Sequence, residues 1–165
     1  DLVTGVQTCA LPISGAGANI ALACDICVAK TSASFIQAFS KIGLVPDSAG
    51  TFFLPRLIGM QKATALMMTG DKVTSQEAVE IGMIFKTFDD ETFEQDAMFL
   101  AEKLSKMPTF GLGMTKRLLN QSFTNNLSQQ LEQEGKLQTM CSESNDYQEG
   151  VSAFLEKRKP EFKGK

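Results

Sequence analysis

The chain has 165 residues, of which 43% are hydrophobic, and its 16 basic and 19 acidic residues give a formal net charge of −3. A slightly acidic chain with no long basic run is a poor candidate for nucleic-acid binding, and no apolar stretch reaches the roughly eighteen residues that a membrane-spanning helix needs. The absence of histidine excludes Ser-His-Asp and Cys-His catalysis and any zinc site with a His ligand, and we expect a cytoplasmic protein.

The first fourteen residues, DLVTGVQTCALPIS, show neither a helical nor a strand period, and Pro12 interrupts their only apolar patch. They have no basic segment and no continuous apolar core, so a secretory signal explains them poorly. The run Val3 to Ile13 resembles the translation of a short-read sequencing adapter, joined to a truncated reading frame at Ser14. We expect residues 1–14 to be a non-native leader that packs weakly.

Helical and strand patterns alternate after the leader. A short apolar helix is predicted at 19–24, strands at 26–29 and 33–36, and an irregular stretch from there through Asp47. Three short helices and a last strand follow, at 48–57, 60–69, 75–81 and 83–88. The third of these helices is expected to begin at a cap on Thr74 or Ser75 and to end at Gly82.

From residue 91 onward the apolar periodicity is almost entirely helical. Helices are predicted at 91–106, 109–123, 127–141 and 147–158. Most of the apolar stripes on these helices, such as Leu112 with Leu118 and Leu119, are explained by an intramolecular core.

The most informative segment is GAGANIALACDICVAKTSASFIQAFSKIGLVPDSAGT, residues 15–51. It places the carboxylate of Asp47 between Pro46 and a run of small residues, where we expect partial desolvation. A partly desolvated carboxyl group can give and take protons near neutral pH, which indicates an enzyme that moves protons. Alternatively, Asp47 only caps a helix that begins at Ser48, because aspartate is a common N-cap residue. The residues alone leave both interpretations open.

Two other motifs give weak signals. Cys24 and Cys27 form a single CxxC, whereas a structural zinc site would need a second pair, so buried reduced thiols are the better interpretation. Gly15 and Gly17 match the first two glycines of a dinucleotide-binding loop, but the third position is Ile20. These glycines are better explained by close approach of the backbone to a substrate, next to helix N-terminal amides that favour a negative oxygen.

Five segments together resemble the enoyl-CoA hydratase/isomerase, or crotonase, superfamily: GAGANIALACD, SASFIQAFSKIGLVPDSAGT, LPRLIG, TGDKVTSQEAVEIGMI and EGVSAFLEKRKPEF. Within it they are most similar to the 2-(1,2-epoxy-1,2-dihydrophenyl)acetyl-CoA isomerases of phenylacetate breakdown. The resemblance runs from about Gly15 to Lys165 and covers only the C-terminal part of such an enzyme. It implies an α/β fold of the ClpP/crotonase type, with the remainder of the core in residues 15–88 and a mostly helical oligomerisation region in residues 89–165.

The resemblance implies an acyl-CoA substrate and no separate cofactor or metal. Members of the superfamily polarise the thioester carbonyl with two backbone N–H groups. The Gly-rich turn supplies one of them, carried here by Ala16 or Gly17, and an earlier segment outside the matched part supplies the other. Because losing one such donor typically costs about a hundredfold in rate, we expect this chain to be nearly inactive alone.

The positions that hydratases of the superfamily use to hold water argue against hydration. Hydratases have a glutamate at each of two positions that are Asn19 and Phe39 here. Asp47 occupies the position of the acid in many isomerases, and a lone acid suits the movement of one proton between carbons. The resemblance also implies apolar contacts to the acyl group, from Phe39, Ile42, Leu44 and Phe53.

The implied reaction converts ring-epoxidised phenylacetyl-CoA to its oxepin isomer through a thioester enolate, with isomerisation of 3-enoyl-CoA to 2-enoyl-CoA as a second activity. A hydratase or hydrolase of CoA esters is one alternative, and a non-catalytic, oligomerising fragment is another. The resemblance further implies a homotrimer, often doubled to a hexamer, for the full-length protein.

Overall fold

The computed structural model describes residues 6–9 and 13–165. Contacts divide the described residues into two compact units, one that ends at Leu100 and one that runs from Ala101 to Lys165. The sequence places the division at 88/89 instead. Helix α5 (Phe93–Ser105) crosses the observed division, because its first turns, with Phe93 and Ala97, pack into the core of the first unit.

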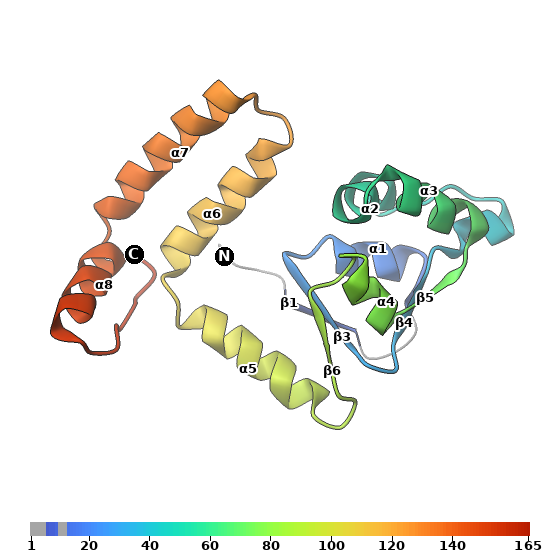
Figure 1. Cartoon of the computed structure of the whole chain (residues 1–165), viewed down its shortest axis with the longest axis horizontal. Helices are drawn as coiled ribbons and strands as arrows, with labels where there is room; N and C mark the ends of the chain where they lie inside the picture. Colours follow the sequence, from blue (N-terminus) through green and yellow to red (C-terminus); the bar gives the residue numbers. More distant parts are fainter. Residues whose placement is uncertain (1–5, 10–12) are drawn as a thin grey trace. The chain divides into compact units, whose positions relative to one another are not determined.

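A parallel sheet of three strands organises the first unit (Figure 1). Strand β3 (Ile26–Lys30) lies between β1 (Val6–Cys9) and β6 (Lys86–Phe88), and Val28 pairs with Lys86. The centre of β3 is completely buried, as expected for a parallel strand that is covered on both faces. The last strand is shorter than the predicted 83–88. Residues 83–85 form bends before the strand and are not part of its ladder with β3.

Two segments of the first fourteen residues are strands, which the sequence did not indicate. Val6–Cys9 is β1, and β2 (Ile13–Ser14) pairs in parallel with β4 (Ser34–Ile36). Backbone pairing with an adjacent strand holds such short elements without any side-chain period. The expected weak packing does not hold for Ile13, which contacts the apolar core. Residues 1–5 and 10–12 lie outside the described residues, and the origin of the leader stays a prediction.

A second sheet contains the short elements next to the predicted site. Strand β4 pairs on its other side with β5 (Lys72–Thr74), which runs antiparallel to it and was not predicted. A 3-10 helix, η1 (Ala38–Ile42), follows β4 within the stretch that was expected to be irregular. Elements of three to five residues depend on tertiary neighbours, so their own sequence carries little signal for them.

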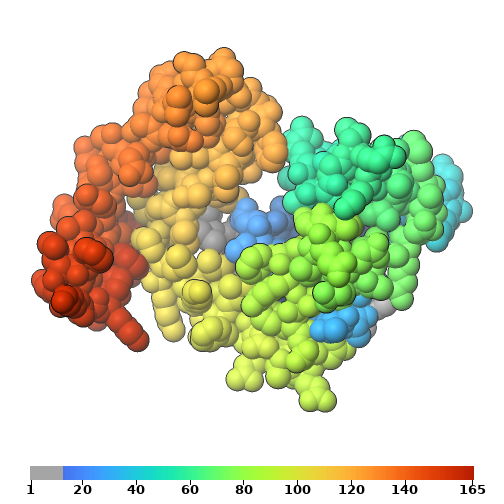
Figure 2. Space-filling view, viewed as in Figure 1, coloured from blue at the N-terminus to red at the C-terminus, as the bar shows by residue number. Residues whose placement is uncertain are grey.

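Four helices pack on these sheets: α1 (Ala16–Leu22), α2 (Gly50–Ile58), α3 (Met60–Thr69) and α4 (Ser75–Glu80). Helices α2 and α3 lie side by side at the surface, in teal in Figure 2. The core that they cover is apolar and includes Ala18, Phe35, Leu54, Ala63, Val73 and Ala78. Helix α4 begins as predicted, since the Thr74 hydroxyl accepts the Glu77 backbone N–H.

The second unit is helical, as predicted. Helices α6 (Thr109–Ser122) and α7 (Leu127–Ser142) run side by side, and α8 (Asn145–Glu156) follows (Figure 1). A capping box between Asn126 and Gln129 fixes the start of α7. The α/β class with a mostly helical C-terminal region is therefore confirmed.

The last residues of the chain fold back onto α8. Backbone N–H groups of Lys163 and Gly164 donate to the two carboxylate oxygens of buried Asp146, at 2.7 and 2.9 Å. Arg158 donates two hydrogen bonds to the Glu149 carboxylate, at 2.6 and 2.8 Å. These charge-assisted contacts tie the tail to the helix that precedes it.

The Glu149 contact predicts a specific dependence on pH. Hydrogen bonds from Arg158 and from the Glu161 backbone lower the pKa of Glu149 from 4.5 to about 2. Because the pKa is lower in the folded state, the contact stabilises the fold fully above pH 4.5, and this stabilisation is lost as the pH falls toward 2. We expect the Glu161 amide proton, followed by NMR, to titrate with a midpoint near pH 2.

The variant Arg158→Gln should move that midpoint upward toward 4.5, the ordinary value for a glutamate. Glu134→Gln removes an exposed carboxylate from α7 and should leave the titration of Glu161 unchanged. A midpoint near 4.5 in the unmodified chain would show that Arg158 does not hold Glu149 in solution.

Candidate functional site

The predicted oxyanion turn lies where β2 runs into α1. Gly15 has a φ of +58° and donates its N–H to the carbonyl of Ile36 in β4, at 3.0 Å. No side chain caps the helix, so the first-turn N–H groups at Ala16 and Gly17 are not used by a cap. Ala16 is half-buried and Gly17 is exposed. Such an N-terminus can donate hydrogen bonds to a negative oxygen.

Phe39 packs against this turn. Its ring is buried, and it lies 3.5 Å from the point that a Cβ atom on Gly15 would occupy. The positive φ and the nearby ring together favour glycine at position 15. The predicted acyl contact of Phe39 thus lies in the core beside the turn.

Asn19 is the polar centre of the site. Its side chain is 1% exposed, and its Nδ2 donates to the backbone carbonyl of Asp47 at 2.9 Å. Gln37, itself 3% exposed, donates from Nε2 to Asn19 Oδ1 at 2.8 Å. A Cβ atom added to Gly50 would overlap the Asn19 amide. Asn19 was predicted to contact the substrate, whereas the structure has both its amide O and its amide N bonded within the chain.

Asp47 lies in a tight turn before α2. Its carbonyl accepts the Gly50 N–H at 2.9 Å as well as the Asn19 amide, and its side chain is exposed. The partial desolvation expected for Asp47 is therefore absent in this chain. The helix-cap alternative is also wrong, because α2 begins at Gly50 after Ala49 and has no side-chain cap.

The two residues after Asp47 adopt an unusual backbone conformation. Ser48 has a φ of 49° and Ala49 a φ of 60°, both in the left-handed region that residues with a Cβ atom rarely adopt. Such a residue costs of order 1–2 kcal/mol and persists only where its surroundings impose it. The two hydrogen bonds to the Asp47 carbonyl are restraints of this kind.

The apolar residues predicted to line the acyl site are divided between core and surface. Phe53 is half-buried and packs edge to face against Phe52, with ring centroids 5.2 Å apart. Ile42 is 73% exposed and Leu44 is 60% exposed, on the segment that leads into Asp47. No described residue of this unit covers Ile42 or Leu44, and Asp47, which follows them, is exposed as well.

Two residues of the site escaped the sequence analysis. Gln37 could have been noticed as the one amide in the apolar run SFIQAF, directly after a predicted strand. Gly50 was counted only as a small neighbour of Asp47. Its contact with Asn19 joins residues that are far apart in the sequence, so no local pattern signals it.

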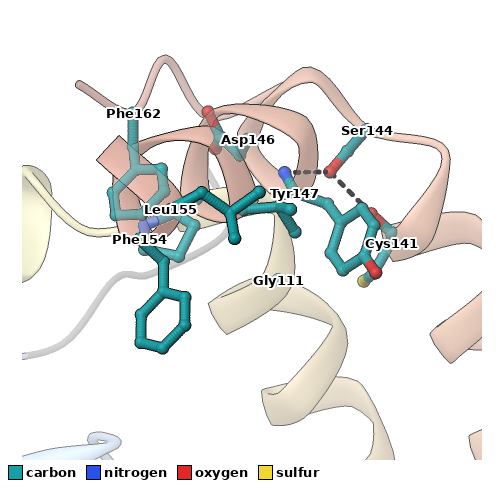
Figure 3. Close-up of a pocket in the computed structure, with 11 residues that line it drawn as sticks. Gly111, Cys141, Ser144, Asp146, Tyr147, Phe154, Leu155 and Phe162 are labelled. Atoms are coloured by element: carbon teal, nitrogen blue, oxygen red, sulfur yellow. Dashed lines mark hydrogen bonds between the residues drawn. The ribbon is translucent and has the colours of Figure 1, made fainter. Parts of the chain in front are cut away.

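An apolar pocket of about 460 Å³ lies within the second unit, between α6, the end of α7 and α8 (Figure 3). Its wall includes Gly111, Cys141, Tyr147, Phe154, Leu155 and Phe162. The one carboxylate among its described lining residues is Asp146, and both its oxygens accept N–H groups from the tail. The pocket therefore offers shape and apolar surface but no carboxylate that is open to a ligand.

The two cysteines of the CxxC lie near the start of β3. Cys24 donates weakly to the Ile20 carbonyl, and Cys27 is buried. Across residues 6–9 and 13–165, no group of three or more His, Cys, Asp or Glu side chains is placed to hold a metal ion. The same residues contain no helix that is long and apolar enough to span a membrane.

Comparisons with known proteins agree with the fold. The family model described as enoyl-CoA hydratase/isomerase matches residues 10–165. A curated relative, the 1,2-epoxyphenylacetyl-CoA isomerase of Escherichia coli K12, is 48% identical over 92% of this chain and 58% of its own length. The 2,3-dehydroadipyl-CoA hydratase of the same strain is 35% identical over 92% of this chain and 59% of its own.

Solved structures give the same result. The enoyl-CoA hydratase/isomerase from Cupriavidus metallidurans CH34 superposes with a TM-score of 0.90 at 30% identity, over 96% of this chain and 60% of that one. The chain therefore spans about three fifths of the length of these relatives.

The contact between Gly50 and Asn19 predicts a cost for any side chain at position 50. Gly50→Ala forces the Asn19 amide or the Asp47 turn to move, so we expect the free energy of unfolding to fall by about 1–3 kcal/mol. Denaturant unfolding measures this change.

Gly111→Ala provides a matched control. Its Cβ atom meets nothing within 4 Å in α6, so this variant should be neutral or more stable by up to about 1 kcal/mol. Equal effects of the two substitutions would contradict the packing described for Asn19.

Proposed function

The chain belongs to the enoyl-CoA hydratase/isomerase family, and from this premise we propose that the full-length protein is a CoA-thioester isomerase. Its proposed substrate is ring-epoxidised phenylacetyl-CoA, which it converts to the oxepin isomer in phenylacetate catabolism. Isomerisation of 3-enoyl-CoA to 2-enoyl-CoA is a second proposed activity. The identity to the E. coli 1,2-epoxyphenylacetyl-CoA isomerase supports this choice of substrate.

The observation that carries the proposal is the set of side chains around the turn of α1. An amide at position 19 and an aromatic ring at position 39 leave Asp47 as the one carboxylate among the three positions. The exposed Asp47 side chain is accessible to a substrate, while the backbone of the same residue is tied to α1 through Asn19. A single, accessible carboxylate on a restrained backbone suits proton transfer between two carbons.

The proposed reaction uses the Asp47 carboxylate and a backbone N–H group at the start of α1. Asp47 takes a proton from the carbon next to the thioester carbonyl, and the electron pair of the broken C–H bond forms an enolate. The backbone N–H of Ala16 or Gly17 donates to the enolate oxygen. Asp47 then returns the proton at a different carbon. With the epoxide substrate, the bond between the two epoxide carbons breaks and its electron pair enters the ring double bonds, which expands the ring to the oxepin, and the proton taken from the side-chain carbon returns to a ring carbon. The reaction is an isomerisation, so it needs no oxidant, reductant or cofactor.

A second oxyanion donor is part of the proposal. By family resemblance it comes from an earlier segment, and this chain covers 58% of the E. coli isomerase and 60% of the Cupriavidus protein. A carbonyl that receives one donor instead of two loses about a hundredfold or more in rate. We therefore propose that the 165-residue chain alone is nearly inactive and that activity belongs to the full-length protein.

Hydration is the second candidate function, because one of the relatives is a hydratase by name. Holding an attacking water would require acceptors at positions 19 and 39. Asn19 uses its oxygen for Gln37 and its nitrogen for Asp47, and Phe39 has no polar atom. Isomerisation is therefore favoured over hydration.

Assembly into a homotrimer or hexamer in the cytoplasm is also proposed for the full-length protein. It is supported by large apolar side chains that stay exposed on α7 and α8. They include Leu127, Leu131, Phe154 and Leu155. Large exposed apolar side chains of this kind are typical of protein contacts when they gather on one face.

Replacing the proposed acid tests the mechanism. In the full-length enzyme, Asp47→Asn keeps the shape of the side chain and removes its basicity, so kcat should fall about a hundredfold or more while KM stays within a few-fold. Steady-state kinetics with a 3-enoyl-CoA measures both constants. A variant that keeps its kcat would sink the role of Asp47 in proton transfer.

Product analysis distinguishes isomerase from hydratase. The unmodified full-length enzyme should isomerise 3-enoyl-CoA or the epoxide far faster than it hydrates 2-enoyl-CoA. The double variant Asn19→Glu with Phe39→Glu should gain only slight hydration and should lose stability, because one carboxylate replaces a buried ring. If 3-hydroxyacyl-CoA forms from the unmodified enzyme at or above the isomerase rate, hydration replaces isomerisation as the proposed function.

A further inference from the structure

The hydrogen bonds around Asn19 form a relay that runs from Gln37 to the backbone of Asp47. We infer that Asn19 and Gln37 are positioning residues for Asp47, and that the acid at position 47 requires an amide at position 19. The relay therefore contributes to the choice of isomerisation over hydration. The catalytic part of this inference rests on the proposed function. The structural part, that Asn19 and Gln37 hold the backbone of Asp47, rests on hydrogen bonds alone.

The hydrogen bond from Gln37 determines which way the Asn19 amide is oriented. Gln37 Nε2 donates to Asn19 Oδ1, so the amide nitrogen of Asn19 faces the Asp47 carbonyl and donates to it at 2.9 Å. A carboxylate in place of Asn19 has no N–H group to donate. It would instead oppose its negative oxygen to the carbonyl oxygen of Asp47. Only an amide satisfies both contacts at this position.

The available space also limits position 19. The Gly50 backbone packs so closely on the Asn19 amide that position 50 has no room for a Cβ atom. A glutamate at position 19 is one methylene longer than asparagine and would need the same space. A glutamate at position 19, as in hydratases of the superfamily, would therefore displace the Asp47 turn from its present conformation.

The backbone beside the relay shows why a restraint is needed. Ser48 and Ala49 both have positive φ values, and relaxation to ordinary values would swing Asp47 away from its position. The Asn19 amide and the Gly50 N–H hold the carbonyl of Asp47 from two sides. The backbone position of Asp47 is thereby held by contacts that do not involve its carboxylate.

Gln37 gives independent support. Within the part of the chain that the structure describes, its Oε1 atom is buried and has no hydrogen-bond partner. A buried acceptor that is left unsatisfied is destabilising, so stability alone gives no reason for a glutamine here. Its Nε2 atom donates to Asn19 Oδ1 at 2.8 Å, which is consistent with orientation of that amide as its role.

The test compares three variants. Asn19→Asp keeps the shape of the side chain and removes the donor to Asp47. Gln37→Met keeps an unbranched side chain of similar length and removes the donor to Asn19. Ser75→Ala is the matched control, because Ser75 is fully buried and its hydroxyl donates to the Thr31 carbonyl at 2.6 Å, outside the relay.

The first readout is hydrogen exchange of the Gly50 amide in the 165-residue chain. Loss of the relay should loosen the turn, so Asn19→Asp and Gln37→Met should each reduce the protection of this amide at least tenfold. Ser75→Ala should leave the ratio of Gly50 protection to that of the slowest-exchanging amides unchanged. This readout does not depend on any catalytic assignment, so it tests the relay even where the proposed function fails.

The second readout is kinetics of the full-length enzyme with a 3-enoyl-CoA. Asn19→Asp and Gln37→Met should lower kcat at least tenfold with KM within a few-fold, whereas Ser75→Ala should keep kcat within twofold. Unchanged Gly50 protection in both relay variants overturns the inference, and so does a fall in kcat no larger than that of the control. If Asn19→Asp does not fold, Gln37→Met decides the result alone. An unmodified full-length enzyme without isomerase activity refutes the proposed function, and the exchange measurement then decides the relay.

Discussion

The hydrogen bond from the Asn19 amide to the Asp47 carbonyl is the constraint on which the rest of the site depends. The donor is buried, and the bond joins helix α1 to a turn that lies 28 residues later in the chain. The first turn of α1 presents the backbone donors of Ala16 and Gly17, and Asn19 lies on the next turn of the same helix. One short helix therefore fixes both the predicted oxyanion donors and the predicted acid.

The same constraint explains why polar groups are buried in a small apolar unit. Asn19 and Gln37 would each cost free energy if left unpaired, yet together they form two hydrogen bonds, including one to a backbone carbonyl. Glycine at position 50 admits the amide, and the strained residues Ser48 and Ala49 complete the turn. Strain and buried polarity at one point are typical of a functional site rather than of a packing solution.

The sequence predicted the elements that carry their own signal. Helix α3 begins and ends where its apolar period predicts, and Thr74 caps α4 as expected. Strands β1, β2 and β5 were missed because they have two to four residues and depend on their neighbours for pairing. The superfamily resemblance is confirmed by the comparisons. Within the site, the sequence pointed to Asp47 and Asn19, and their functional roles stay predictions. The burial of Asn19, the exposure of Asp47 and the contact of Gln37 with Asn19 depend on tertiary contacts that no local pattern contains.

A double-mutant cycle on kcat tests the central claim, that Asn19 acts through Asp47, most directly. It compares the full-length enzyme with Asn19→Asp, Asp47→Asn and the combined variant at saturating 3-enoyl-CoA. If Asn19 only positions the acid, its substitution should lower kcat strongly when Asp47 is present and hardly at all when Asp47 is already replaced, a coupling of about 1–3 kcal/mol. Fully additive losses in the combined variant would contradict the account, because they would show that Asn19 acts independently of Asp47.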